Sequence, residues 1–356
     1  MSDEIRVLLL DSLERLLREQ CTPERVQEME PHGFDAELWQ QVCDLELQRA
    51  ALPEQQGGVD AGLPVMVELV QLAAAAALSA PVAEMMVLAP WLAGQAGIEL
   101  PDGLVIVAGW SPGLQAELVN GQLLVTGILS RVPFGRFADR VWTTAALDGK
   151  SFLIDLPVDA AKLEPGSNLA AEASDQLFFE RCVVDSDRYH QLPAGSQQQL
   201  AELGALTRAA AMVGALRRAQ ELSHNYVSER QQFGRPLSKF QAIQQQLAMF
   251  AAELEAAAVM VGVAALEFES ALPEQRLLSV ASAKIQAGQA ASMGARIVHQ
   301  VHGAMGFTQE YPLHHATRRV WSWRDDYGTE SYWALRVGDQ TVAATGPGLW
   351  PLLTGT

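Results

Sequence analysis

The stretch RQQFGRPL (residues 230–237) and the segment QVHGAMGF (residues 300–307) decide how this 356-residue chain is interpreted. The arginine that opens the first stretch stands at the end of a predicted helix, where it can pair a phosphate through two parallel N–H bonds. Glycines in both segments let the backbone approach a ligand where any Cβ would collide. Gln241, just beyond the first stretch, opens a further helix whose N-terminal amides favour a phosphate group. Together these residues predict a site for a charged, planar cofactor.

The composition is that of a well-buried globular protein with an acidic surface. Of its residues 49% are hydrophobic and 19% are charged, and 42 acidic against 25 basic side chains give a net charge of −17. Such a surface argues against nucleic acid and anionic membranes as main partners. The length predicts two or three packed subdomains.

Neither the cysteines nor the first residues indicate secretion. Cys21, Cys43 and Cys182 lie far apart without a CxxC spacing, which is typical of reduced thiols in a cytosolic protein. The start, residues 1–4, is acidic and lacks a basic segment followed by an apolar stretch. The most apolar run, residues 69–92, is interrupted by prolines and is expected to be a buried core helix. We therefore expect a cytoplasmic protein without a membrane span.

Three segments of different character follow one another along the chain. Residues 1–101 predict an N-terminal α-helical domain, in which an Ala-rich helix runs from about Val65 to Leu78. Residues 102–187 contain short β-rich runs separated by turn signals, of which Asn120-Gly121 is a strong hairpin signal, and predict an antiparallel β domain. Residues 188–356 return to longer amphipathic helices, which predict a C-terminal four-helix bundle. The expected fold class is α+β, mainly α.

This order of segments, together with the two cofactor segments, resembles the acyl-CoA dehydrogenase family. The resemblance implies FAD, which one subunit binds in the main and a neighbouring subunit completes across an interface. It also implies an acyl-CoA substrate, an oligomer, and an electron-transferring flavoprotein as electron acceptor. The residues that match the family's FAD contacts are Arg230, Phe233, Gln241, Gln300, Gly303 and Ala304, the last of which stands where the family has glycine.

Each cofactor segment also has a purely structural interpretation. Residues 229–237 could form a corner between two helices, with Phe233 in the core and Arg230 in a surface salt bridge. Gly303 and Gly306 could end a helix as C-cap residues, which leaves Gln300 unexplained.

The histidines and aromatic residues of the C-terminal segment favour structural roles. His302, His314 and His315 lack acidic or cysteine partners at ligand spacing, so no metal site is predicted. The aromatic residues between Trp321 and Trp333 are expected to pack in the core and at interfaces, with the floor of a wide substrate cavity as the alternative.

The resemblance fails at the catalytic base, the carboxylate that removes the α-proton of an acyl thioester. Where the family has this carboxylate before Gly-Thr, in register after Arg318, the chain has Tyr327. A phenol has a pKa of about 10 and is a poor base at neutral pH. Some relatives carry the base on an earlier helix, where Glu202 is the nearest carboxylate, two residues or about 200° away from the expected position. We expect Glu202 to be an exposed helix residue, and the catalytic base stays unassigned.

The half of the flavin site that the chain should build for itself also departs from the family. The segment at residues 107–113, which in relatives holds the isoalloxazine and the acyl-CoA, is much shortened. Pro133 stands where relatives carry a threonine beside the flavin ring, and it offers neither a hydroxyl nor an N–H. The half that a subunit supplies to its neighbour is retained.

Three hypotheses follow from this asymmetry. The favoured one is a subunit of a hetero-oligomeric acyl-CoA dehydrogenase with the base on a sister chain, an arrangement that resembles family members acting on steroid side-chain thioesters. The second is a self-sufficient, homo-oligomeric dehydrogenase with a relocated base. The third is a non-catalytic acyl-CoA-binding or scaffold subunit on the same fold.

Overall fold

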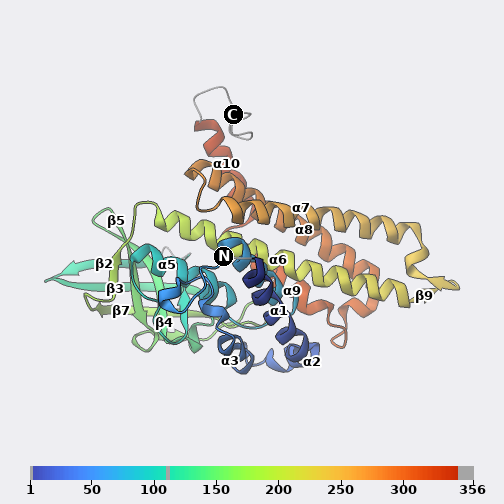
Figure 1. Ribbon diagram of the computed structural model, residues 1–356, viewed down its shortest axis with the longest axis horizontal. Helices are drawn as coiled ribbons and strands as arrows, with labels where there is room; N and C mark the ends of the chain where they lie inside the picture. The colour runs from blue at the N-terminus through green and yellow to red at the C-terminus, as the bar shows by residue number, and fades with distance from the viewer. Residues whose placement is uncertain (1–2, 110–112, 344–356) are drawn as a thin grey trace. The chain divides into compact units, whose positions relative to one another are not determined.

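The computed structural model describes residues 3–109 and 113–343 (Figure 1). Contacts divide the chain into two compact units, the first formed by residues 1–62 and 78–204 and the second by residues 63–77 and 205–356. A β domain lies between helical segments of the chain, so the predicted class, α+β and mainly α, is confirmed. The three domain boundaries predicted from the sequence stay predictions.

The helices of the first unit come mostly before its strands, and two of them, α2 and α3, begin at capping residues. Thr22 accepts a hydrogen bond from the Arg25 N–H, and Asp35 accepts one from the Leu38 N–H, which satisfies backbone donors in the first turn. The helices are α1 (Asp3–Gln20), α2 (Pro23–Met29), α3 (Ala36–Asp44), the π-helical turn η3 (Glu84–Leu88) and α5 (Ala89–Ala96), with short 3-10 helices between them.

The apolar run at residues 69–92 is not a single helix, which corrects the prediction. The helix α4 (Leu63–Ala75) ends first, Pro81 follows, and η3 begins at Glu84. Between them the chain turns at Ala77, which has a φ of 58°, and Pro81 stands at the start of the next helical segment, where the N–H that it lacks is not needed.

The strands of the described residues in the first unit form two four-stranded sheets, ordered β1-β4-β5-β8 and β2-β3-β7-β6. Neighbouring strands are antiparallel except β1 and β4, which pair in parallel. The strands are β1 (Val105–Val107), β2 (Leu114–Val119), β3 (Gln122–Pro133), β4 (Arg140–Leu147), β5 (Lys150–Pro157), β6 (Lys162–Glu164), β7 (Ser174–Val184) and β8 (Tyr189–Gln191).

Two hairpins of these sheets close through two-residue turns. Asn120 and Gly121 join β2 to β3 with φ angles of 51° and 80°, and Asp148 and Gly149 join β4 to β5 with 49° and 76°. Positive φ at both turn residues is the requirement of a type I′ turn, which Asn-Gly and Asp-Gly meet at little cost. The predicted Asn120-Gly121 hairpin is confirmed.

The second unit consists of long helices. They are α4, the greater part of α6 (Ser196–Glu229), α7 (Gln241–Glu267), α8 (Pro273–His302), α9 (Leu313–Asp325) and α10 (Glu330–Ala343). Figure 1 shows α7 and α8 side by side, and they are antiparallel. Gln286 donates a hydrogen bond to Glu253 at 2.6 Å, and any Cβ on Gly294 would collide with the Phe250 ring. Small residues on α8 thus allow close packing of the two helices.

The helix α7 leaves much of its apolar surface uncovered. By length and composition alone, α7 is the one helix among the described residues that could cross a membrane, and only a third of its most apolar stretch is buried. The expectation that the chain has no membrane span therefore stays a prediction. The exposed apolar side chains on this helix are Met249, Val259, Met260, Val263 and Leu266.

Candidate functional site

The stretch at residues 230–237 forms a β-hairpin at the end of α6. The strands β9 (Gln231–Gln232) and β10 (Arg235–Pro236) pair in an antiparallel ladder, and Phe233 and Gly234 form the turn with φ angles of 52° and 75°. The Phe233 side chain is 90% exposed. The interpretation of this stretch as a helix corner with Phe233 in the core is therefore wrong.

Phe233 occupies an unfavourable position for its residue type. A bulky side chain at positive φ is a conformational outlier, and type I′ turns prefer Asn or Asp at this place. Its ring is exposed apart from an edge contact with Phe240, whose centroid is 6.3 Å away. Phe233 thus breaks a local conformational preference and makes no buried contact with the described residues that would offset the cost.

Phe233→Asn is expected to leave the stability of the isolated chain unchanged or raise it by up to about 1 kcal/mol, because Asn accepts positive φ more readily. The same change is expected to reduce the FAD content of the assembled protein, because the exposed ring is lost. Thermal unfolding and the flavin-to-protein absorbance ratio measure the two effects. A less stable chain with unchanged flavin content contradicts this role.

The backbone of Arg230 is held by two hydrogen bonds, while its side chain is exposed. Its N–H donates to the Tyr226 carbonyl at 2.8 Å, and its carbonyl accepts from the Leu237 N–H at 2.9 Å. The exposed guanidinium makes no ion pair with residues 3–109 or 113–343. By contrast, the Arg235 guanidinium lies over the Phe240 ring at 4.2 Å. The surface salt bridge considered for Arg230 is thus not formed among the described residues.

The second segment ends α8 and continues into the 3-10 helix η7 (Gly303–Phe307). Gly303 has φ 60° and ψ −135°, a conformation that residues with a Cβ avoid, and its N–H donates to the His299 carbonyl. The C-cap interpretation is confirmed for Gly303. Gln300 and Ala304 are exposed beside it, and the cap explains neither.

Both segments lie at the same end of the helical bundle of the second unit. The contacts of Phe250 with Gly294 and of Glu253 with Gln286 set the antiparallel register of α7 and α8. Continued to the helix ends, this register brings the start of α7, at Gln241, level with the end of α8. The matched residues Arg230, Phe233, Gln241, Gln300, Gly303 and Ala304 are all exposed there.

His302 anchors the end of α8 from the inside. Its ring is 2% exposed, stacks on Tyr226 with centroids 4.5 Å apart, and donates from Nδ1 to the Val298 carbonyl at 2.7 Å. Its Nε2 lies 3.2 Å from the Tyr311 hydroxyl, which in turn lies 3.1 Å from the Leu222 carbonyl. Burial lowers the pKa of His302, so the ring is neutral and braces the segment that presents Gln300.

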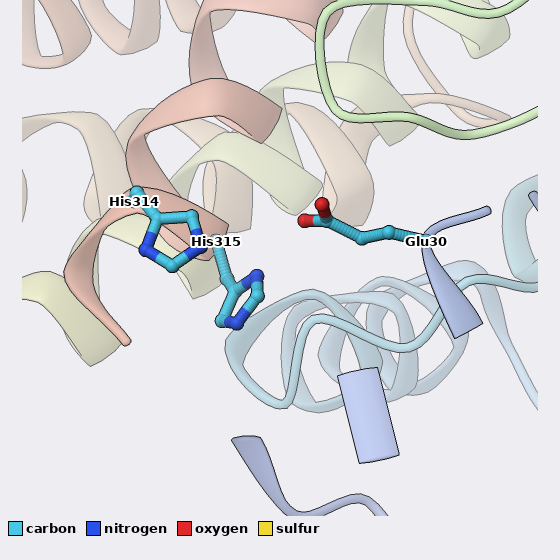
Figure 2. Close-up of side chains that lie close together, drawn as sticks. All are labelled: Glu30, His314 and His315. Carbon is cyan, nitrogen blue, oxygen red and sulfur yellow. The ribbon is translucent and has the colours of Figure 1, made fainter. Parts of the chain in front are cut away.

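His314 and His315 lie next to one another on α9, with ring centroids 4.0 Å apart (Figure 2). His314 donates from Nδ1 to the Tyr311 carbonyl at 2.9 Å. Among the described residues of the second unit, no third histidine, thiol or carboxylate joins the pair at ligand distance. Figure 2 also draws Glu30, a residue of the first unit, and no metal site is assigned to these residues.

Tyr327 takes part in a buried turn between α9 and α10. It is 6% exposed and has a φ of 54°, and Gly328 follows with a φ of 96°. The Trp333 indole donates to the Tyr327 carbonyl at 2.9 Å, and the Arg208 guanidinium lies 5.7 Å from the Tyr327 ring centroid. The side chain at the family's base position is therefore a packed phenol.

The carboxylates beside Tyr327 are already paired. Asp326 lies 3.4 Å from Arg208, and Glu330 lies 2.5 Å from Arg324. Among the described residues, every buried carboxylate belongs to the first unit. The described part of the second unit thus offers no buried, unpaired carboxylate near Tyr327.

Lys284, which the sequence pattern did not single out, is buried beneath this turn. Its ammonium group donates to the Trp323 and Arg324 carbonyls at 2.9 and 2.8 Å and so holds the last turn of α9. Burial lowers the pKa of Lys284 to about 7, against the opposing effect of the Asp326 carboxylate. The signal that could have found it is a single lysine within the Ala-rich, buried stretch of α8.

Lys284 is expected to make stability depend on pH. Between about pH 7 and pH 10 the unfolded chain binds a proton that the folded lysine lacks, so this group raises the free energy of unfolding with pH by up to about 1.4 kcal/mol per unit. Lys284→Met should remove this rise in the free energy of unfolding with pH. Denaturant unfolding of both proteins across this range measures it, and equal slopes contradict the assignment.

Glu202 was predicted to be an exposed residue of α6, and this prediction is wrong, because its side chain is buried. Its side chain is 0% exposed, and its Oε1 accepts a hydrogen bond from Gln198 at 2.7 Å. Its role as a base stays untested.

The β segment that is shortened relative to the family is described only in part, because residues 110–112 lie outside the described residues. Pro133 ends β3 opposite Ser174.

Comparison with known proteins agrees with this architecture. The N-terminal domain model of acyl-CoA dehydrogenases matches residues 3–99, and the C-terminal domain model matches residues 196–332. The acyl-CoA dehydrogenase FadE27 of Mycobacterium tuberculosis is 26% identical over 327 residues, which cover 83% of this chain and 85% of the relative. Glutaryl-CoA dehydrogenase of Desulfococcus multivorans is 39% identical over 149 residues, 40% of this chain and 37% of that protein.

Solved structures share the fold along nearly the whole chain. A chain of the ChsE4-ChsE5 complex from Mycobacterium tuberculosis superposes with a TM-score of 0.89 at 22% identity, covering 97% of this chain and 99% of that chain. Butyryl-CoA dehydrogenase from Megasphaera elsdenii gives 0.84 at 21% identity, with 96% and 99% covered. The chain belongs to the acyl-CoA dehydrogenase family, whose members are FAD-binding oxidoreductases.

Proposed function

We propose that this protein is a subunit of a hetero-oligomeric acyl-CoA dehydrogenase that desaturates an acyl-CoA between its α and β carbons. The observation that carries the proposal is an asymmetry within the second unit. The side chains matched to FAD are exposed, and Arg230 makes no ion pair with the described residues. The position expected for the base holds Tyr327, whose phenol is packed in the interior. A chain with the first feature and without a carboxylate base suits a subunit that completes a site on its neighbour.

The residues of this chain fit the diphosphate end of FAD. Arg230 supplies a guanidinium that has no ion pair with the described residues and can pair a phosphate through two N–H bonds. Gly303 leaves the backbone bare at the end of α8, and Gln241 and Gln300 present amides at the same end of the bundle. FAD, when bound, supplies the acceptor for the hydride from the β carbon.

The α-proton requires a carboxylate, and we place it on a sister subunit. Asp326 and Glu330 are held in ion pairs with arginines. Tyr327 offers a phenol, whose ordinary pKa of about 10 makes it a poor base. Two similar solved structures are the ChsE4-ChsE5 complex and a Tcur3481-Tcur3483 steroid acyl-CoA dehydrogenase, which supports both the paired arrangement and a bulky acyl group.

The oligomer also accounts for the apolar surface of α7. Val259, Val263 and Leu266 lie on one face of this helix at spacings of four and three residues, and all three are exposed. An apolar helix face of this kind is best buried against another subunit. We further propose a cytoplasmic location and transfer of electrons to an electron-transferring flavoprotein.

The experiment compares the chain expressed alone with the chain expressed beside a second family member from the same genome. We expect FAD binding and acyl-CoA turnover on co-expression and neither from the chain alone. A yellow, active preparation of the single chain would instead identify a self-sufficient homo-oligomer, and Glu202→Gln then tests Glu202 as its base. Neither colour nor turnover in any pairing would favour a non-catalytic subunit.

A further inference from the structure

A cavity of about 410 Å³ opens in the first unit and contains none of the residues matched to FAD. Its walls come from α3, the 3-10 helix η1 (Leu47–Arg49), the segment before β1 and the 3-10 helix η4 (Gly135–Phe137). This volume falls within the range of small-molecule sites in proteins. The side chains that decide its chemistry are Phe34, Trp39, Cys43, Gln48, Arg49 and Asp139.

One wall of the cavity is aromatic. Phe34 and Phe137 lie with centroids 5.0 Å apart, and Trp39, which is 7% exposed, lies on α3 and lines the same cavity. Arg136 already occupies a position over Phe137, 5.9 Å from its centroid. Aromatic faces bind flat apolar groups and attract cations, and an indole face does so most strongly.

The charges around the cavity leave a negative excess. The only basic side chain in its lining, Arg49, lies 2.7 Å from the Asp102 carboxylate and donates to the Gln56 carbonyl at 3.2 Å. Asp139 accepts the Leu104 N–H at 2.7 Å, and it makes no ion pair with the described residues. The Asp139 carboxylate therefore lines the cavity without a compensating cation from the described part of the chain.

The cavity also has an unused hydrogen-bond acceptor. The side-chain oxygen of Gln48 is buried and has no hydrogen-bond partner among the described residues, and the residue lines the cavity. A buried polar atom without a partner costs free energy, which a donor entering the cavity would recover after a small rotation of the amide. Burial, with the nearby Asp44, raises the pKa of the Cys43 thiol to about 11, so this thiol is neutral and does not add a charge.

We propose that this cavity binds a small organic cation with a flat apolar body, such as an arylalkylamine. The body packs against Trp39 and Phe34, and the ammonium group faces Asp139 and the Gln48 oxygen. Anionic ligands are disfavoured, because Arg49 is already paired and the chain as a whole carries a net charge of −17. This site is independent of the FAD site and of the proposed function.

Cys43 provides a reporter in the wall of the cavity. The full chain is treated with iodoacetamide, and the alkylation rates of Cys43 and Cys182 are followed by mass spectrometry with and without 2-phenylethylamine. We expect the amine to slow alkylation of Cys43 and to leave Cys182 unchanged. The alcohol 2-phenylethanol, which has the same body without the charge, should need an about five-fold higher concentration for equal protection.

Asp139→Asn keeps an acceptor for the Leu104 N–H and removes the charge. It should raise the amine concentration for half-protection about three- to five-fold and leave the response to the alcohol unchanged. Asp148→Asn, in the exposed turn between β4 and β5, is the matched control and should change neither. Equal protection by amine and alcohol, no protection of Cys43, or an equal response of the two variants would overturn the proposal.

Discussion

Arg230→Ala is expected to lower the affinity of the assembled protein for FAD by about 10- to 100-fold, the value of one or two hydrogen bonds to a charged phosphate. The fold should not change, because the Arg230 side chain is exposed and its backbone bonds to Tyr226 and Leu237 do not involve it. FAD titration of the apo-oligomer, followed by flavin absorbance, measures the effect. Arg230→Lys should recover only part of it, since lysine cannot form the two parallel bonds.

Lys239→Ala is the matched control for this prediction. Lys239 is exposed in the 3-10 helix η6 (Leu237–Lys239), directly after the hairpin, and its loss removes the same charge. A general electrostatic attraction for FAD would weaken equally in both variants. Equal losses, or an unchanged affinity in Arg230→Ala, would remove Arg230 from the site.

Replacement of both Val263 and Leu266 by arginine is expected to dissociate the oligomer into its subunits. Both side chains are exposed on α7 in the isolated chain, at 42% and 70%. In the proposed oligomer this face is buried against another subunit, and moving two charges from water into that interface is costly. Loss of the subunit contact should also release FAD, because the proposed site requires two subunits. Light scattering coupled to gel filtration gives the mass, and flavin absorbance gives the occupancy.

Leu8→Arg provides the control for the α7 change. Leu8 is also an exposed apolar residue, at 65%, but it lies on α1. Its replacement should leave mass and flavin content unchanged. An oligomer that survives the double change in α7, or a chain that sediments with lipid vesicles through this helix, would contradict the proposed use of this face.

Local sequence signals predicted those parts of the fold that depend on a few adjacent residues. Asn120-Gly121 predicted a hairpin because its residue types accept positive φ. The turn at Phe233-Gly234 has the same geometry, but the hairpin was not predicted, since phenylalanine does not favour a type I′ turn and a helix corner was the structural alternative considered there. The parallel pairing of β1 with β4 could not be predicted, since strand partners far apart in sequence leave no local pattern.

The burial of Glu202 and Lys284 was hidden for a related reason. Both lie in Ala-rich helices that are covered on more than one side, so the apolar spacing no longer marks an inward face. A charge on such a helix is expected to be exposed, and only tertiary contacts show otherwise. The two cofactor segments could be proposed from sequence because their residue types are specific, and their contact with FAD stays a prediction. The absence of an ion-pair partner for Arg230 among the described residues could be seen only in the structure.

A structure of the FAD-loaded oligomer tests the central claim most directly, through the distance from the Arg230 guanidinium to the FAD diphosphate. We predict hydrogen bonds of about 2.8 Å to a diphosphate that another subunit holds in the main, with Gln241 and Gln300 beside it. A diphosphate bound wholly within one subunit, with the Arg230 side chain of every copy in solvent, would contradict this claim.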